Sequence, residues 1–346
     1  MIEAFFHAWE RRLASVTTDR VVRPFEWGLD WIGAPRPDPE GPASTVLSDW
    51  VSHVMRDTDA FFTPAPTRDY QLGPADEQGD RILTFPSALE TPHPANNTVY
   101  CRLVPARRSA PRRAAVLVLP QWNSDEGGHV GLCRLMAMNG LTALRLSLPY
   151  HDRRMPPELH RADYIVSANI ARTLQVCRQA VLDARRAIAW LAAQGFERIG
   201  ICGSSLGSCL SLLTTAHEPL IRTQALNHIS PYFADVVWRG LSTQHVREGL
   251  DGHIELDLLR ALWRPISPHW YLERVRNRKT LLVYARYDLT FPVDLSEDLV
   301  NEFRARDIPH ELAVLSCGHY STGKTPFKFI DGWILTRFLK RTLTRD

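Results

Sequence analysis

The period of the hydrophobic positions changes near residue 80. Before that point, residues of two stretches recur at helical spacing, namely Ile2, Phe5, Phe6, Trp9 and Leu13, and then Leu47, Trp50, Val51, Val54, Thr58 and Phe61. The proline-rich segment 33–42 separates the two stretches and is typical of a loop. Residues 1–78 are too few to bury a good core alone, so we predict a helical N-terminal extension that packs on the rest of the chain.

From residue 79 to residue 346, short apolar strands alternate with amphipathic helices. We expect eight strands, at 81–85, 98–104, 114–119, 142–148, 199–202, 224–229, 280–284 and 311–315. The longest helix is predicted over 164–194, where apolar residues are spaced by four and three, and Gly195 ends it. The alternation predicts an α/β domain with a mainly parallel eight-stranded sheet that helices cover on both faces.

One segment interrupts the alternation. Residues 231–275 are rich in Trp, Leu and Arg and read as helices inserted between two strands, which predicts a lid over the sheet edge. The tryptophans Trp238, Trp263 and Trp270 either form the core of this lid or line an apolar acyl pocket.

Composition narrows the class of protein. The chain has 346 residues, of which 45% are hydrophobic and 23% charged, with a formal net charge of +3 and no dense basic block. These values are ordinary for a globular protein and do not point to nucleic acid as a partner. The N-terminus lacks the features of a signal peptide, and no apolar run reaches the ~18 residues of a membrane span. The six cysteines form no C-x-x-C pair, so we expect reduced thiols in a cytoplasmic protein.

The first chemical motif is Gly203-Ser204-Ser205-Leu206-Gly207. It follows the strand at 199–202 and precedes a helical run, which is the context that a G-x-S-x-G nucleophile elbow needs. Ser205 would stand at the turn with its hydroxyl held out above the sheet edge. The alternative is that Ser205 is only a small residue in a tight turn.

Two further residues follow later strands in the chain order of a catalytic triad. Asp288 stands in the loop after strand 280–284, and His319 follows strand 311–315 with Gly318 before it. Alternatives remain for both positions: Asp294 and Asp235 for the acid, and His310 and His269 for the histidine.

From about residue 80 to its end, the chain resembles the α/β-hydrolase superfamily in the order Ser205, Asp288, His319 and in the context of each residue. Within it, the chain looks similar to the serine esterase and prolyl-oligopeptidase-like families, although no propeller-sized N-terminal domain is present. The resemblance implies Ser205 as nucleophile, His319 as general base and acid, and Asp288 as the group that orients the imidazole.

The resemblance also implies an oxyanion hole with two backbone N–H donors. One is Leu206, and the other lies in the loop after strand 114–119, where Pro120-Gln-Trp-Asn123 replaces the usual His-Gly start. Pro120 cannot donate, so we expect Trp122, with Gln121 as the alternative. Substrate-pocket candidates in this and the next loop are Asn123, Tyr150 and His151, of which the latter two could equally be surface residues.

Together these features predict a carboxylesterase-like serine hydrolase that cleaves a small-molecule ester or thioester through an acyl-enzyme. An acyltransferase on the same triad, a lipase-type deacylase of a lipid and a prolyl-oligopeptidase-type peptidase are the alternatives. A binding protein that kept the fold would be expected to have a broken triad. No Walker motif, dinucleotide fingerprint or paired metal-ligand spacing is present, so no cofactor and no metal are predicted.

Overall fold

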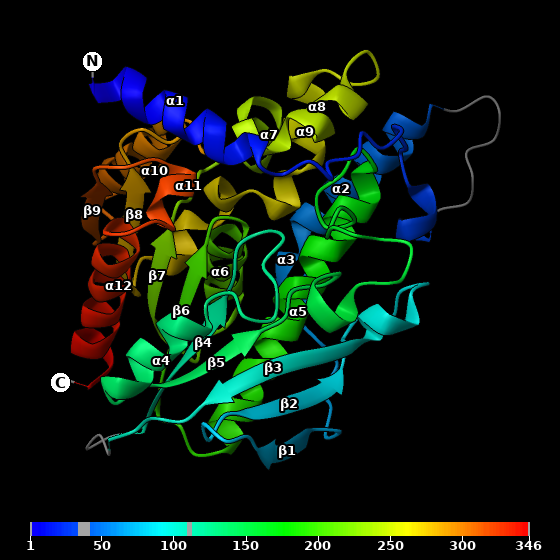
Figure 1. Cartoon of the computed structure of the whole chain (residues 1–346). Helices are drawn as coiled ribbons and strands as arrows, with labels where there is room; N and C mark the ends of the chain where they lie inside the picture. The colour runs from blue at the N-terminus through cyan, green and yellow to red at the C-terminus, as the bar shows by residue number, and fades with distance from the viewer. Residues whose placement is uncertain (1, 34–41, 109–112, 345–346) are drawn as a thin grey trace.

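The protein is described by a computed structural model that covers residues 2–33, 42–108 and 113–344 (Figure 1). Most of the loop predicted over 33–42 lies outside these residues. A nine-stranded sheet forms the centre, with strands β1 Gln71–Ala75, β2 Arg81–Pro86, β3 Thr98–Val104, β4 Ala114–Leu119, β5 Thr142–Leu146, β6 Arg198–Ser204, β7 Ile221–Asn227, β8 Lys279–Ala285 and β9 Glu311–Leu315. Their order across the sheet is β1-β2-β3-β5-β4-β6-β7-β8-β9. Strands β1, β2, β3 and β5 pair antiparallel, and from β5 to β9 all neighbours are parallel.

Strand β4 shows why its sequence is apolar throughout. All six residues are buried, and Ala115, Leu117 and Leu119 belong to one core cluster while Val116 and Val118 belong to another. Successive side chains of a strand point to opposite faces, so a strand covered on both faces needs a continuous apolar run.

Helices form a layer on each face of the sheet (Figure 1). Helices α4 Val130–Met138 and α12 Phe327–Thr344 share one core cluster with the sheet, whereas α5 Ile170–Ala193, α6 Leu206–His217 and α10 Val293–Ala305 share the other. Since the parallel strands all end at the same edge, the loops between these two layers meet there.

The segment before β1 holds helices α1 Ile2–Ser15, α2 Ala43–Arg56 and α3 Thr58–Phe61 and the 3₁₀ turn η1 Leu29–Ile32. Helix α1 runs across the end of the sheet where the parallel strands terminate, beside α11 His319–Thr322 (Figure 1). Phe6 of α1 stacks on Tyr287 with ring centroids 4.6 Å apart, directly before the residue predicted as the triad acid.

The segment predicted as a lid lies over the same edge (Figure 1). It contains α7 Phe233–Arg239, η4 Leu241–Thr243, α8 Gln244–Leu250, α9 Leu256–Leu262, η5 Arg264–Ile266 and η6 Pro268–Val275. Trp263 is fully buried and donates its indole N–H to Ile170 O, while the guanidinium of Arg264 lies over the half-exposed ring of Trp270. Trp238 is covered by Arg247, so Trp238 and Trp270 pack against arginines of the segment, whereas Trp263 joins the segment to α5. None of the three lines the cavity described below.

Two differences from the predicted elements have simple causes. The sheet has a ninth strand, β1, at its edge. The sequence pattern does not predict this strand, because Gln71–Ala75 contains Gly and Pro and shows no apolar alternation, which an edge strand tolerates. The long helix begins at Ile170 rather than near 164, because the Asn169 side chain caps it by accepting the N–H of Arg172. The short 3₁₀ turns η2 Pro94–Asn97 and η3 Asp152–Arg154 complete the loops before β3 and after β5.

No helix among the described residues combines the length and the apolar character needed to cross a membrane.

Candidate active site

Ser205 stands at the turn between β6 and α6. Its backbone has φ 57° and ψ −121°, a conformation that non-glycine residues rarely adopt. The turn is held by the Ser205 N–H, which donates to Asn227 O at 2.7 Å, and by Ser208 Oγ, which lies 2.7 Å from Gly203 O. Within the described residues Ser205 Oγ makes no hydrogen bond, and the side chain lines a cavity of about 860 Å³.

The two glycines of the motif are required by close backbone approach. A Cβ at Gly203 would overlap Gly207 O, and a Cβ at Gly207 would overlap the carbonyl oxygens of Leu119 and Pro120. The first turn of α6 therefore packs directly on the end of β4, which brings the loop at 120–123 next to Ser205.

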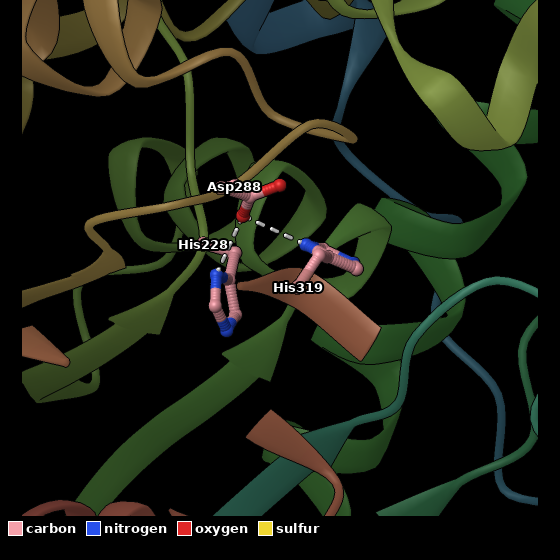
Figure 2. A group of neighbouring side chains, drawn as sticks. All are labelled: His228, Asp288 and His319. Atoms are coloured by element: carbon pink, nitrogen blue, oxygen red, sulfur yellow. Dashed lines mark hydrogen bonds and ion pairs between the residues drawn. The ribbon is translucent and has the colours of Figure 1, made fainter. Parts of the chain in front are cut away.

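Asp288 and His319, the residues predicted as the acid and the histidine, lie in contact. His319 Nδ1 lies 3.0 Å from Asp288 Oδ2 (Figure 2). The other carboxylate oxygen, Oδ1, accepts the backbone N–H groups of Thr290 and Phe291, each at 2.8 Å. His319 also stacks on the Phe291 ring and lines the same cavity as Ser205, so the imidazole is fixed on two sides.

A second histidine, His228, shares the same carboxylate oxygen. Its Nδ1 also lies 3.0 Å from Asp288 Oδ2, and its ring centroid is 4.6 Å from that of His319 (Figure 2). The sequence pattern does not single out His228, because the strand predicted from it runs to residue 229. Strand β7 ends at Asn227, and His228 follows with φ 58°, which turns it toward Asp288. A histidine directly after a buried strand, at the edge where sites form, was the available signal.

The charges in this group shift its pKa values in opposite directions. Burial raises the pKa of Asp288. The positive charge of His319 and the hydrogen bonds from His228 and His319 lower it by more than burial raises it, so the pKa lies well below its usual range. Burial lowers the pKa of His319, but the charge and hydrogen bond of Asp288 outweigh burial and raise it above its ordinary value. For His228 burial dominates and the pKa is lowered, which favours a neutral ring. The group therefore consists of one ionised acid, one histidine held neutral and one whose basicity is increased.

The backbone donors expected for an oxyanion hole lie beside Ser205. In the part of the chain that the structure describes, the N–H groups of Leu206, Gln121 and Trp122 have no hydrogen-bond acceptor. All three residues line the cavity. The Trp122 side chain is anchored, because its indole N–H donates to Ala162 O at 2.9 Å and its ring stacks on His245.

The three predicted pocket residues lie in different places. Asn123 lines the cavity, with φ 59° and its side-chain Oδ1 accepting the Ala162 N–H at 2.8 Å. His151 is buried behind it: its Nδ1 lies 2.9 Å from Pro149 O and its Nε2 accepts the Asn123 N–H at 2.9 Å. Burial lowers the pKa of His151 to about 4, so the ring is neutral and can accept this bond. His151 thus supports the loop from behind rather than facing the cavity.

Tyr150 is also buried and does not line the cavity. Its hydroxyl lies 3.0 Å from His93 Nδ1, and its N–H donates to Asn96 Oδ1. The backbone turns at Tyr150 with φ 64°, which directs the side chain toward these partners.

The structure places the alternative triad residues away from Ser205. Asp294 is exposed and pairs with Arg239, and the buried Asp235 accepts Arg260 Nε at 2.9 Å. His310 Nδ1 lies 2.9 Å from Ile308 O, and His269 contacts Tyr232.

His228, Asp288 and His319 also have the residue types of a metal site, with one ligand atom of each within 4.8 Å of the others. In the arrangement seen, both Nδ1 atoms serve the hydrogen bonds to Asp288 Oδ2. A metal bound here through Nδ1 would have to displace both of these protons.

A comparison with solved structures finds several proteins whose helices and strands have a similar arrangement. The acetyl xylan esterase from Paenibacillus sp. R4 is similar with a TM-score of 0.60 and 14% identity, covering 96% of this chain and 99% of that chain. Acetyl xylan esterase 1 from Thermoanaerobacterium sp. JW/SL YS485 gives a TM-score of 0.57 and 13% identity, over 90% and 98% of the two chains. Acylaminoacyl peptidase from Pyrococcus horikoshii gives 0.58 and 14%, over 80% of this chain but only 42% of that longer chain.

No family model matches the chain, and a search of curated proteins finds no match. The sheet order, the elbow and the structural likeness define the fold as that of the α/β-hydrolases.

Proposed function

We propose that the protein is a serine hydrolase that cleaves a carboxylic ester or thioester through an acyl-enzyme. The observation that carries this proposal is one cavity that holds Ser205 on a strained turn and His319 on the carboxylate of Asp288. The similar solved structures include acetyl xylan esterases, and this agrees with ester cleavage.

In the proposed reaction, His319 Nε2 takes the proton of Ser205 Oγ as this oxygen attacks the acyl carbon. Asp288, ionised and bonded to Nδ1, stabilises the imidazolium that forms. The negative oxygen of the tetrahedral intermediate accepts N–H bonds from Leu206 and from Trp122 or Gln121. His319 then protonates the leaving oxygen or sulfur. In the second step, His319 takes a proton from a water molecule as the water attacks the acyl-enzyme, and it returns this proton to Ser205 Oγ as the acid leaves.

Three related activities use the same first half-reaction. An acyltransferase would pass the acyl group to an alcohol or amine, a lipase-type deacylase would take a lipid ester, and a peptidase would cleave an amide. The cavity of about 860 Å³ is large enough for a drug-sized or acyl-chain substrate and does not favour any of these three over the hydrolase.

All six cysteines are buried free thiols, which agrees with a proposed cytoplasmic location.

A fluorophosphonate probe tests the proposal, since it reacts covalently with an activated serine. We expect the wild type to be labelled and Ser205→Ala and His319→Ala to lose the label. Ser204→Ala is the matched control, because Ser204 is the adjacent serine and lines the same cavity. Loss of the nucleophile or the base should lower ester hydrolysis by about 10⁴-fold or more.

An unlabelled wild-type protein would overturn the hydrolase proposal, and a labelled Ser205→Ala variant would overturn the choice of nucleophile. Product analysis with and without an added alcohol or amine separates hydrolase from acyltransferase. A series of p-nitrophenyl esters of increasing chain length then measures the acyl group that the cavity accepts.

A further inference from the structure

Among the described residues, those that line the cavity with a charged side chain are mostly basic. Apart from histidines they are Arg20, Arg161, Lys328 and Asp331. Asp331 is the acidic member, and burial raises its pKa to about 7, so it is only partly ionised near neutral pH. A cleft lined by charges of one sign concentrates ligands of the opposite sign. The cavity therefore favours a negatively charged ligand.

Arg20 follows helix α1 and is held at the cavity by Tyr320, the residue after His319. Its Nη2 donates to Tyr320 Oη at 3.0 Å and to Ala14 O at 3.2 Å. Tyr320 Oη in turn lies 2.7 Å from Ser242 Oγ, and both of these residues line the cavity. Arg20 Nη1 has no hydrogen-bond partner among the described residues and is not buried, so it is free to bind a ligand.

Arg161 brings a second guanidinium group to the same part of the cavity. Its Cζ lies 5.6 Å from the centre of the Trp122 ring, and Trp122 lines the cavity. Its Nη1 donates at 3.0 Å to Asp19, which directly precedes Arg20. Within the described chain, Nη2 is neither paired nor buried. Burial lowers the pKa of His245, and the charges of Arg161 and Arg20 lower it further, so both guanidinium groups lie near this one ring.

The acids beside the two guanidinium groups leave one positive charge unbalanced. Asp163 lies 3.6 Å from Arg161 Nε, but Arg23 holds the same carboxylate at 3.0 Å and balances it. Asp19 balances Arg161 from outside the cavity, with 53% of its side chain exposed. Arg20 forms no ion pair with the described residues. A carboxylate, with a single negative charge, matches the charge that remains, whereas a doubly charged phosphate exceeds it.

We propose that Arg20 and Arg161 form a subsite for a carboxylate of the substrate, so that the protein cleaves an ester or thioester of an acid-bearing molecule. This inference rests on the proposed hydrolase function and names its substrate class. The carboxylate lies away from the scissile bond, where Arg20 Nη1 and Arg161 Nη2 can donate to it. Hydrogen bonds between charged groups are stronger than neutral ones. A substrate with a neutral group in this position loses that contribution.

Two pairs of esters test the subsite, and each pair compares a carboxylate with a neutral amide of similar shape. Monoethyl adipate and its terminal amide place the group on the acyl side, whereas 4-acetoxybutanoate and 4-acetoxybutanamide place it on the alcohol side. We expect wild-type kcat/KM to favour the carboxylate by about tenfold or more in one of the pairs. Raising the salt concentration from about 0.02 M to about 0.5 M should lower this preference, because salt screens the charges.

The variants Arg20→Gln and Arg161→Gln remove one charge each and keep an amide that can still donate to Tyr320 or Asp19. We expect each to lose most of the preference for the carboxylate, and Arg20→Lys and Arg161→Lys, which keep the charge, to retain more of it. The control is Arg11→Gln. Arg11 is exposed on α1 and does not line the cavity, so this variant loses the same net charge but should keep the wild-type ratio.

Equal kcat/KM values within both pairs, or an undiminished preference in the folded Gln variants, would overturn the subsite and leave the two arginines a structural role only. If the Gln variants do not fold, the salt series decides, since a preference that salt does not lower also contradicts the proposal. Such results leave the hydrolase proposal standing as long as the esters are cleaved. Failure of the hydrolase proposal looks different, because none of the four esters is then cleaved and the fluorophosphonate does not label the protein.

Discussion

At the scale of single residues, the central feature is the full use of the Asp288 carboxylate. Oδ1 accepts hydrogen bonds from two backbone N–H groups, and Oδ2 accepts one from the Nδ1 atom of each of His228 and His319. Four donors hold the carboxylate in one orientation, and the histidines keep its pKa well below its usual range. In the proposed mechanism, His319 is then the group that gains and loses a proton during the reaction.

This arrangement predicts a pH profile and a role for His228. Protonated His319 cannot take the serine proton, so kcat/KM should fall as the pH drops through the pKa of His319. Burial lowers that pKa and Asp288 raises it more strongly, so the acid limb of the wild type should lie above pH ~6.5. In His228→Ala, Asp288 Oδ2 bonds to His319 alone, so we expect the limb to move to higher pH and kcat to fall by about tenfold because the carboxylate is less constrained.

His228→Asn is the matched variant, because its amide nitrogen can replace Nδ1 as a donor to Asp288. It should recover most of the wild-type kcat and the wild-type acid limb in a pH–rate profile of ester hydrolysis. A purely structural role for His228 would instead lower the melting temperature in both variants and leave the acid limb where it is.

At the scale of elements, the strand, turn and helix around Ser205 were predictable because their signals are local. The apolar run before the turn, the two glycines and the leucines after it lie within about sixteen neighbouring residues. The loops that carry Asp288 and His319 were predictable for the same reason, since each follows its own apolar strand.

Residues that support the site from other elements were not predictable in this way. His151 fixes the loop at Asn123 from 28 positions away, and His228 reaches Asp288 across 60 positions. Nothing in the local pattern around either histidine marks its partner, because the contact depends on how strands neighbour each other in the sheet. The edge strand β1 escaped prediction for a different reason, namely that an edge position relaxes the apolar alternation on which strand prediction depends.

The elbow also makes a prediction about the packing of α6. Gly207→Ala places a Cβ against the carbonyl oxygens of Leu119 and Pro120, so α6 must move away from the end of β4. We expect a loss of ~1–3 kcal/mol in the free energy of unfolding, measured by urea denaturation. We also expect a large loss of kcat, because α6 moves relative to the donor loop, which stays with β4.

Gly131→Ala is the control for Gly207→Ala. Gly131 is likewise the second residue of its helix, α4, but a Cβ there meets nothing within 4 Å. This variant should gain roughly 0.5–1 kcal/mol, since alanine loses less backbone entropy on folding than glycine. Equal tolerance of both substitutions would contradict the close packing of α6 on β4.

At the scale of the whole molecule, the N-terminal helix is tied to the segment that carries His319, the proposed catalytic histidine. Glu10 of α1 is fully buried and accepts the N–H groups of Tyr320 at 2.7 Å and Ser321 at 2.9 Å. These are the two residues after His319, about 310 positions away in the chain. Gly318 is required for this contact, because a Cβ there would overlap the Glu10 carboxyl group.

The contact predicts that α1 contributes to catalysis as well as to stability. In Glu10→Ala the two N–H groups lose their acceptor, so His319 is held less firmly against Asp288. The negative charge of Glu10 also raises the pKa of His319, after the larger effects of burial, which lowers it, and of Asp288, which raises it. We expect kcat for ester hydrolysis to fall by about 10- to 100-fold, with a lower melting temperature and an acid limb at lower pH.

The control for Glu10→Ala is Glu3→Ala on the same helix. The Glu3 side chain is 72% exposed and, among the described residues, pairs only with His7, at 4.0 Å, so its removal should change neither kcat nor the acid limb. Thermal denaturation and a pH–rate profile of the two variants together decide the role of Glu10. If Glu10→Ala melts earlier but keeps the wild-type kcat and acid limb, α1 only stabilises the fold. If both kinetic quantities change in Glu10→Ala alone, the helix at the start of the chain helps to position the histidine near its end.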